Sequence, residues 1–516
     1  EVAAALAVAL TLLLAAWRRR GARLVLLAGL LLALGGAGSR LWAAIPAAEG
    51  TVRRPDVIVI LLDTLRADHA HLLESEDATD GKASGWSSEF FRFSRAYSPG
   101  SRTGLALPGI MTSLSARVVG STLSPDANTL AELLQSAGYT TLGISANPRI
   151  SRQFGYDQGF DRLILPGGGS DFLVVSLLKL AVAAAPGVSY RLGIADGDLF
   201  YPRVTRLRRR AIRLLEHSTR PTFLYLQTMD IHGPYLPPKD YLPSDYEPGE
   251  FISYFRFVRL SGDALRSAEL APGLRNLRQR HAAEVRFTGD ELERLVSDLE
   301  KRGRWEETLV WILSDHGEAL GEHGDAGHGG GNLASGVLRI PLWLKLPRSW
   351  GLTPRVIHAP VSAYDLLPTT LSLLGLPALR ESFGVDLNPL VLDDAADLER
   401  VVISQSTAGR PPELRNLYAS VRGDWKLHLT VGSEEVLARA LYDLGDDPGE
   451  STNVAAQHLD VVAELEAAVH THRLQEARLA YSQRGRTVDF KTMEQLRSLG
   501  YAIDEETVRP PRRNEE

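Results

Sequence analysis

Acidic and histidine side chains are concentrated in one stretch of the chain, which reads LVWILSDHGEALGEHGDAGH from Leu309 to His328. Its apolar first residues, Leu309 to Leu313, predict a buried parallel strand that ends just before Asp315 and His316. In open α/β sheets the carboxyl ends of the strands form the edge where ligands bind. A carboxylate beside an imidazole is also a usual pair of ligands for zinc or manganese. A solvated polar turn is the alternative, but the repeated histidines favour a metal site.

Two more apolar runs end in residues of the same chemical types. Val57 to Leu62 leads into Asp63, and Thr222 to Met229 leads into Asp230 and then His232. Taken alone, Asp63 could be a helix cap and His232 a core histidine. Because parallel strands end at a common edge of a sheet, however, we expect these side chains to lie near the histidine-rich loop.

Together these residues suit catalysis on an anionic ester. Two carboxylates and one imidazole would bind a single divalent cation and leave a fourth tetrahedral position for a hydroxyl or a substrate oxygen. The expected ligands are Asp63, Asp315 and His316. The other histidines would hold the outer oxygens of the anionic group or protonate the leaving group. His232 and His328 are the main candidates for this role, and His323 is a further one.

A cluster of small and hydroxyl residues, Ser98 to Gly104, lies between a predicted strand and a predicted helix. The strand covers Phe91 to Tyr97, and the helix covers Leu105 to Leu114 and is entered through Pro108. A hydroxyl near a helix N-terminus faces backbone N–H groups that can receive an oxyanion. The cluster therefore predicts a nucleophile near Thr103.

The other apolar segments alternate between helix and strand periodicity, which indicates an α/β sheet with parallel strands. Helices are predicted over Ala131–Ala137, Ala282–Arg302 and Val361–Leu374, and strands over Thr141–Ser145 and Arg339–Leu346. From about Val401 the pattern changes to short strands, followed by a helix near Val461 to Arg473. This change predicts a smaller antiparallel layer packed on the main sheet.

The composition excludes several classes of function. The chain has 516 residues and a formal net charge of -6, so it offers no electrostatic footprint for nucleic acid. It contains no cysteine, which excludes disulfides, thiolate metal sites and cysteine nucleophiles.

The first residues of the chain predict a membrane anchor. Val2 to Trp17 and Leu24 to Ser39 are almost wholly apolar, and a cluster of arginines separates them. Each run is a little short of the roughly 20 residues that cross a bilayer, but Trp17 and Trp42 would lie at its interfaces. We interpret the runs as two transmembrane helices whose positive connection is cytoplasmic, which places the rest of the chain outside the cytoplasmic membrane. A secretory signal, with the second run as its apolar region, is the alternative.

This organisation divides the chain into four segments. They are a membrane anchor over residues 1–46, a catalytic domain over 52–400, a C-terminal subdomain over 401–480, and an extension and tail over 481–516. Within the catalytic domain, Phe172 to Ala185 is apolar but interrupted. We interpret it as a buried or surface-lying helix, with a substrate lid as the alternative.

Several motifs of the chain resemble those of the sulfatase family, which belongs to the alkaline phosphatase superfamily. Those around the predicted site are DVIVILLDTLRADH from Asp56, HGPY from His232, and SDHGE from Ser314 with HG at His328. Those away from it are LAELLQSAGY from Leu130, YDLLPT from Tyr364, LYDL from Leu441 and LRSLGY from Leu496. The resemblance covers about Arg54 to Tyr501. It implies a large mixed, mostly parallel sheet sandwiched by helices, with a smaller C-terminal antiparallel sheet.

The resemblance leaves alternatives open at the nucleophile. Ser98-Pro-Gly-Ser-Arg102 is similar to the segment in which sulfatases form formylglycine from cysteine or serine, but Gly100 departs from the family pattern. Thr103 with Gly104 resembles the nucleophile segment of phosphoethanolamine transferases, which implies that Thr103 is also a metal ligand. We rank Thr103 first, Ser101 second and Ser98 third.

The resemblance implies a metal-dependent hydrolase that cleaves a sulfate or phosphate ester through a hydroxyl nucleophile. Together with the apolar N-terminal runs, it leads us to expect a membrane-anchored enzyme whose catalytic domain is extracytoplasmic. The cofactor is expected to be one divalent ion of zinc, manganese or calcium. Thr64 replaces the acidic residue that usually follows Asp63 in sulfatases, which weakens a calcium-type site. One alternative is a phosphoethanolamine or phosphoglycerol transferase acting on an envelope glycan or lipid. A second is an inactive sulfatase-like envelope protein.

Overall fold

The computed structural model describes residues 54–74, 85–165, 200–218, 221–329, 331–408, 415–432 and 435–479. Apart from Arg54, these residues belong to one compact unit, Pro55–Glu516. The predicted membrane anchor, residues 1–46, and the apolar segment Phe172–Ala185 lie outside the described residues. Among the described residues, no helix is both long enough and apolar enough to cross a bilayer.

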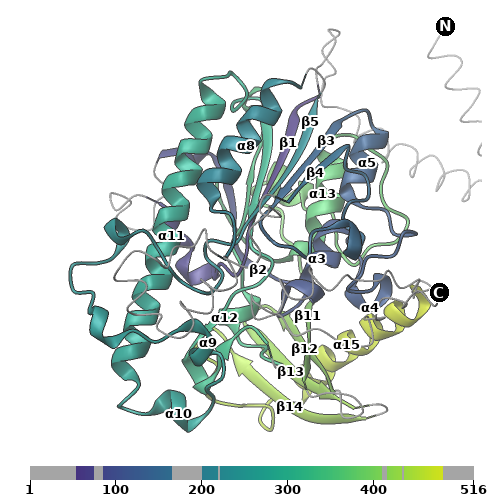
Figure 1. Cartoon of the computed structure of the whole chain (residues 1–516). Helices are drawn as coiled ribbons and strands as arrows, with labels where there is room; N and C mark the ends of the chain where they lie inside the picture. The colour runs from purple at the N-terminus through teal and green to yellow at the C-terminus, as the bar shows by residue number, and fades with distance from the viewer. Residues whose placement is uncertain are drawn as a thin grey trace, which may run out of the picture. The chain divides into compact units, whose positions relative to one another are not determined.

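An eight-stranded sheet forms the centre of this unit, with the strand order β10-β2-β9-β6-β1-β5-β3-β4 (Figure 1). The strands are β1 (Asp56–Leu62), β2 (Phe91–Tyr97), β3 (Thr140–Ser145), β4 (Arg162–Ile164), β5 (Thr222–Thr228), β6 (Thr308–Leu313), β9 (Leu342–Lys345) and β10 (Val356–Ser362). β1 pairs in parallel with both β5 and β6, whereas β9 runs antiparallel to β6 and β2. The sheet is therefore mixed and mostly parallel, which confirms the predicted architecture of the main sheet.

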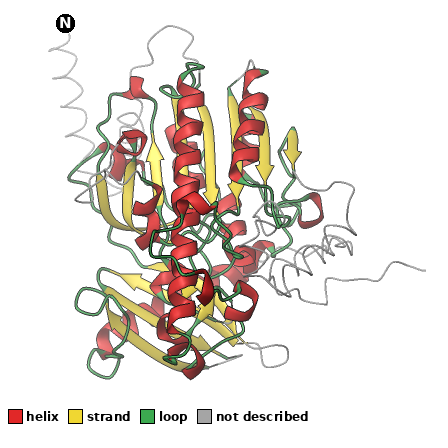
Figure 2. Cartoon of the chain, turned by 60° about the vertical axis from the view of Figure 1, so that its left-hand side comes forward, coloured by secondary structure: helices red, strands yellow, loops and turns green. Residues whose placement is uncertain are grey.

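Helices cover both faces of the sheet, and its central strands are buried along almost their whole length. Every residue of β5 and β6 is buried, as expected for parallel strands with two covered faces. Figures 1 and 2 show the helices on either side. One core cluster contains residues of α8 (Val204–Glu216) and α11 (Ala271–Glu300). The other contains residues of α3 (Thr103–Thr112), α5 (Leu130–Ser136) and α13 (Leu366–Leu373).

A smaller sheet of four antiparallel strands follows in the chain, as predicted. Its order is β11 (Val402–Ala408), β12 (Arg415–Arg422), β13 (Trp425–Val431) and β14 (Val436–Asp443). The helix α15 (Leu459–Leu479) packs on it through Val462, Leu465 and Val469. The short elements used below are α4 (Ala116–Val119), α9 (Tyr254–Phe257) and α12 (Ser335–Leu338).

Most predicted helices differ from the observed ones by one or two residues at their start, but two begin at clearly different residues. α11 begins at Ala271 rather than Ala282, because polar residues of its first turns are buried and paired. Arg280, for example, is fully buried and donates to the carbonyl oxygens of Tyr235 and Ile252. The predicted helix from Val361 is wrong at its start, since that residue belongs to β10 and α13 begins at Leu366.

Candidate metal centre and nucleophile

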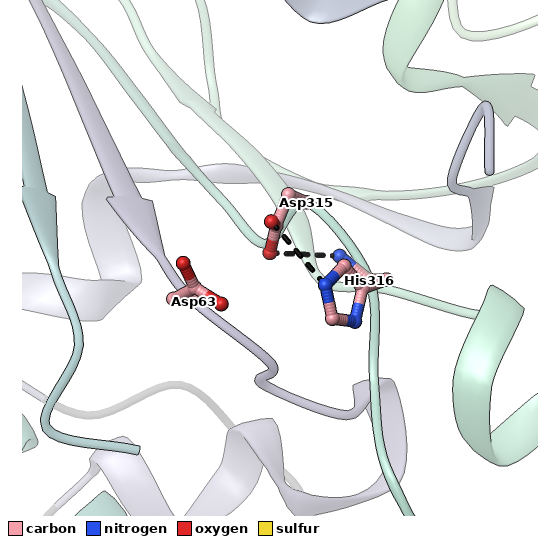
Figure 3. A group of neighbouring side chains, drawn as sticks. All are labelled: Asp63, Asp315 and His316. Carbon is pink, nitrogen blue, oxygen red and sulfur yellow. Dashed lines mark hydrogen bonds and ion pairs between the residues drawn. The ribbon is translucent and has the colours of Figure 1, made fainter. Parts of the chain in front are cut away.

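The three predicted metal ligands meet at the carboxyl edge of the main sheet. Asp63 follows β1, and Asp315 and His316 follow β6, the parallel neighbour of β1. All three side chains are fully buried. One potential ligand atom from each lies within 4.8 Å of the others, and Figure 3 shows the two carboxylates and the imidazole side by side.

Only one of the two carboxylate oxygens of Asp63 accepts hydrogen bonds from neighbouring side chains. Its Oδ2 accepts hydrogen bonds from Asn147 Nδ2 at 2.8 Å and Gln227 Nε2 at 3.0 Å. Its buried Oδ1 has no hydrogen-bond partner among the described residues. Burial raises the pKa of Asp63 to about 8, and the negative charge of Asp315 also raises it. A buried carboxylate in this position calls for a positive charge nearby.

Asp315 has the same arrangement. Its Oδ1 accepts from the backbone N–H groups of Thr64 at 3.3 Å and His316 at 3.0 Å. Its Oδ2 is buried without a hydrogen-bond partner in the described part of the chain, and His316 Nε2 lies 3.4 Å away. The two carboxylates therefore each present one unsatisfied buried oxygen, which is what a cation needs.

The imidazole of His316 is fixed in the tautomer that suits a metal ligand. Its Nδ1 lies 2.9 Å from the carbonyl oxygen of Gly317, and a carbonyl can only accept, so Nδ1 carries the proton. Nε2 then presents a lone pair toward the carboxylates. Two carboxylate oxygens and one imidazole nitrogen fit zinc or manganese.

Thr103 lies beside this triad. It is the first residue of α3 and is fully buried, and its Oγ1 is 3.1 Å from His316 Nε2. The preceding residue, Arg102, gives α3 no side-chain cap. The structure therefore brings Thr103 to the predicted ligands, next to a helix N-terminus that can receive an oxyanion.

The other two hydroxyl candidates lie in the same loop but bind elsewhere. The hydroxyl of Ser98 donates to the carbonyl oxygen of Asp315 and accepts from the N–H of Gly100 at 3.1 Å. Ser101 Oγ pairs with Ser406 Oγ at 2.7 Å. Within the described residues, neither hydroxyl contacts a side chain of the triad. Ser98 instead holds the backbone of the loop that carries Asp315.

Two of the three candidate histidines lie near the triad. The ring of His328 lies 4.4 Å from the ring of His316 and 5.2 Å from that of His232, measured between centroids. His232 is buried, and its Nδ1 donates to the carbonyl oxygen of Gly233 at 2.7 Å. His323 is exposed and has a φ of 56°. Its backbone carbonyl oxygen accepts a hydrogen bond from the side chain of Arg266. The structure does not bring its ring to the triad.

Glu318 is a further part of the site that the sequence reasoning gave no role. Its buried carboxylate accepts from His328 Nδ1 at 2.8 Å, Tyr235 Oη at 2.7 Å and Tyr254 Oη at 3.1 Å. Burial alone would raise the pKa of Glu318, but His328, His232 and the hydrogen bond from Tyr235 together outweigh burial and lower the pKa to about 2. An ionised Glu318 thus orients the His328 ring. The sequence feature that could have identified Glu318 as part of the site is its place in the SDHGE motif.

Asn147 and Gln227, which hold Asp63, were also missed. Gln227 lies in β5, the parallel neighbour of β1, and Asn147 follows β3, the next strand beyond β5. The rule that strand ends gather at one edge would have found Asn147, had amides been considered with carboxylates and histidines.

The C-terminal sheet holds the nucleophile loop in place. Gln405, in β11, donates its N–H to the carbonyl oxygen of Pro99 at 2.9 Å and accepts from the N–H of Ser101 at 3.0 Å. The hydroxyl of Ser404 donates to the carbonyl oxygen of Ser98 at 2.6 Å. The loop before Thr103 is therefore hydrogen-bonded alongside β11.

Comparison with known proteins agrees with this geometry. The family model described as Sulfatase matches residues 55–376, so the chain belongs to the sulfatase family. Steryl-sulfatase of Mus musculus is 30% identical over 219 residues, which are 35% of either chain. Choline-sulfatase of Rhizobium meliloti is 26% identical and matches 46% of this chain and 47% of its own. The chain thus spans a third to a half of the length of these curated relatives.

Solved structures share the fold over a larger part of the chain. The phosphonate monoester hydrolase of Agrobacterium radiobacter superimposes with a TM-score of 0.61 at 20% identity, covering 83% of this chain and 96% of its own. The phosphonate monoester hydrolase of Silicibacter pomeroyi gives a TM-score of 0.58 at 18% identity, with 85% and 98% covered. At these identities the likeness defines the alkaline phosphatase-like fold and not the substrate.

Proposed function

We propose that this protein is a membrane-anchored, extracytoplasmic hydrolase that cleaves a sulfate or phosphate ester with one divalent metal ion. Membership of the sulfatase family supports the reaction class, and the apolar N-terminal runs support the anchor and location. Asp63, Asp315 and His316 hold the ion, because each turns an unsatisfied or lone-pair atom toward the others. When bound, the ion supplies positive charge that lowers the pKa of an adjacent hydroxyl.

The single observation that carries the mechanism is the distance of 3.1 Å between Thr103 Oγ1 and His316 Nε2. In the first step, Thr103 Oγ1 forms a bond to sulfur or phosphorus while the bond to the leaving ester oxygen breaks. The hydroxyl passes its proton to solvent water, and the leaving oxygen gains a proton from His328. A water molecule then attacks the same sulfur or phosphorus atom while the bond to Thr103 Oγ1 breaks. One proton of this water restores the threonine hydroxyl, the other restores His328, and sulfate or phosphate is released.

The test combines intact mass and metal analysis with turnover. The purified protein is exposed briefly to an aryl phosphate and an aryl sulfate in parallel. We expect one bound zinc or manganese, a covalent adduct on the peptide with Thr103, and loss of at least ~100-fold in kcat/KM in Thr103→Ala. The matched control is Thr471→Ala, which removes an exposed threonine hydroxyl of α15. Full activity of Thr103→Ala, or formylglycine at Ser98 with turnover of the sulfate ester alone, would overturn Thr103 as nucleophile.

A second candidate is transfer of a phosphoethanolamine or phosphoglycerol head group to an envelope glycan or lipid. The observation that favours it is that an ordinary threonine hydroxyl, rather than Ser98, lies beside the triad. A threonyl ester has to be broken by attack at phosphorus or sulfur, which an acceptor alcohol can do as well as water. Consumption of a membrane-lipid donor with a phosphoethanolamine or phosphoglycerol head group in vesicles, with no release of free head group, would support transfer over hydrolysis.

A further inference from the structure

We propose that the outer side of α8 binds the surface of an anionic phospholipid membrane through a row of arginines, here called the arginine stripe. The stripe consists of Arg206, Arg209, Arg210 and Arg213. The inference rests on the proposed function in one respect, because it assumes that the protein is anchored in a membrane. It assigns an interaction surface to a helix that the metal ligands, the histidines and the nucleophile do not use.

The four arginines share one side of α8, because they are spaced three and four residues apart and a helix makes one turn in 3.6 residues. Arg206, Arg209 and Arg213 are exposed, and Arg210 is half-buried. The opposite side of the helix packs into the core through Val204, Leu207, Ala211 and Leu215. α8 therefore presents an apolar side to the sheet and a cationic side to the solvent.

The charges of the stripe work against the helix that carries them. Arg206 and Arg210, and likewise Arg209 and Arg213, are four residues apart, and like charges at this spacing destabilise a helix. In the described part of the chain, Arg209, Arg210 and Arg213 pair with no carboxylate. Arg213 donates from Nε to the backbone carbonyl oxygen of Arg209 at 3.2 Å. An external anion would offset this repulsion.

Other arginines of the surface have acidic partners. Arg208, on another side of α8, bonds to Glu291 of α11 at 2.9 Å, and the exposed Arg478 of α15 bonds to Glu381 at 2.8 Å. The whole chain has a formal net charge of -6. The stripe is therefore a local concentration of positive charge and not a consequence of a basic composition. The partner that it fits is anionic.

The shape and place of the stripe fit a membrane surface. The 13 residues of α8 extend over about 20 Å, so the stripe presents its guanidinium groups along a line that many phosphates of a lipid surface can meet. Nine residues, 47–55, separate the proposed anchor from Asp56, where β1 begins. Arg304 donates to Asp56 Oδ2 at 2.8 Å and to the carbonyl oxygen of Ser218 at 2.7 Å. The end of α8 thus lies beside the start of β1.

The test uses the absence of cysteine, which lets a single introduced cysteine carry a fluorophore. His217→Cys places the label on an exposed residue at the end of α8. The full chain is reconstituted in vesicles of phosphatidylcholine, alone or mixed with phosphatidylglycerol, that contain a quencher-labelled lipid. We expect quenching with phosphatidylglycerol only, and less of it at high salt, because screening shortens the range of the charges. The control label is His470→Cys, on an exposed residue of α15, and should stay unquenched.

Charge variants connect this signal to the stripe. Arg209→Gln with Arg213→Gln should lower the ratio of docked to undocked protein roughly fivefold for each arginine, whereas lysine at both positions should preserve it. Turnover of a soluble aryl ester should stay as in wild type. The matched control is Arg348→Gln with Arg478→Gln, which removes the same charge from exposed residues that have acidic partners, and should leave quenching unchanged.

The result has two clear refutations. Equal quenching in both lipids, or quenching that survives both glutamine substitutions in the stripe, would refute lipid binding by these arginines. A response to soluble dextran sulfate but not to anionic vesicles would assign the stripe to a soluble polyanion and overturn the proposal. Flotation with phosphatidylcholine vesicles tests the anchor separately. A chain that fails to float would refute the proposed anchor, while quenching by phosphatidylglycerol vesicles still decides whether the stripe binds lipid.

Discussion

The carboxylate of Glu318 provides the sharpest test of how the site orients its histidines. Glu318→Gln keeps the size of the side chain but replaces one acceptor oxygen with an NH2 group. The native carboxylate accepts three hydrogen bonds, from His328, Tyr235 and Tyr254. With glutamine, at least one of these donors faces another donor, and the remaining bonds lose the assistance of the charge.

The expected loss follows from the cost of such bonds. A hydrogen bond to a charged group is worth about 1.5–3 kcal/mol, and about 1.4 kcal/mol corresponds to a tenfold change in rate. If His328 acts through an orientation that Glu318 sets, kcat should fall roughly 10- to 100-fold in Glu318→Gln. KM should change less, because the metal ligands and Thr103 stay in place.

The assay measures kcat and KM separately for Glu318→Gln, His328→Ala and the double variant. If Glu318 acts through His328, the double variant should lose little more activity than His328→Ala alone. Tyr254→Phe is the matched control, since it removes the longest of the three bonds, at 3.1 Å, and leaves the 2.8 Å bond to His328. A Glu318→Gln protein with wild-type kcat, or losses that simply add in the double variant, would contradict this role.

Two other predictions concern the ion and the stability of the fold. Zinc or manganese at about 100 times its Kd should stabilise the protein by ~2.7 kcal/mol, seen as a higher Tm, and Asp315→Asn should abolish this shift. At the junction with the C-terminal sheet, Glu450 is bound by Lys426 and lies beside His428, and these two outweigh burial and hold the pKa of Glu450 well below its ordinary value of 4.5. Ionised Glu450 therefore stabilises the fold above about pH 4.5, and this stabilisation is lost as the pH falls. Glu450→Gln should lower the free energy of unfolding by about 3–5 kcal/mol at pH 7 and by less at pH 4. Urea unfolding at both pH values measures the difference, and a gap that does not narrow at pH 4 would contradict the assignment.

The sequence could predict the metal ligands because the information is local. A buried apolar run followed at once by Asp63, or by Asp315 and His316, places polar atoms at a strand end whatever the rest of the fold does. The alternation of strand and helix patterns likewise predicted the main sheet, and the change to short strands predicted the smaller C-terminal sheet. The prediction failed at Val361, because Leu366, Leu367 and Leu371 continue an apolar pattern that fits a helix, although β10 ends only at Ser362.

The supporting contacts could not be read from the sequence, because they join residues far apart in the chain. Glu318 accepts from Tyr254, which lies 64 positions earlier, and the nucleophile loop is held by Gln405, about 300 positions later. No periodicity links such pairs.

These long-range contacts link the C-terminal sheet to the candidate site, although the sheet is far from the metal ligands in the chain. β11 provides hydrogen bonds to Ser98, Pro99 and Ser101, the residues that lead into Thr103. The same sheet is also linked to the far side of the site through Glu450, in the loop after β14. Glu450 accepts from Lys426 of β13 at 2.8 Å and from the N–H of Ser335, at the start of α12, at 2.9 Å. α12 in turn accepts the N–H of Gly317 through Val337 at 2.7 Å. The loop with the nucleophile and the loop with His316 are thus both tied to one sheet, so the C-terminal layer determines how Thr103 and the metal ligands face each other.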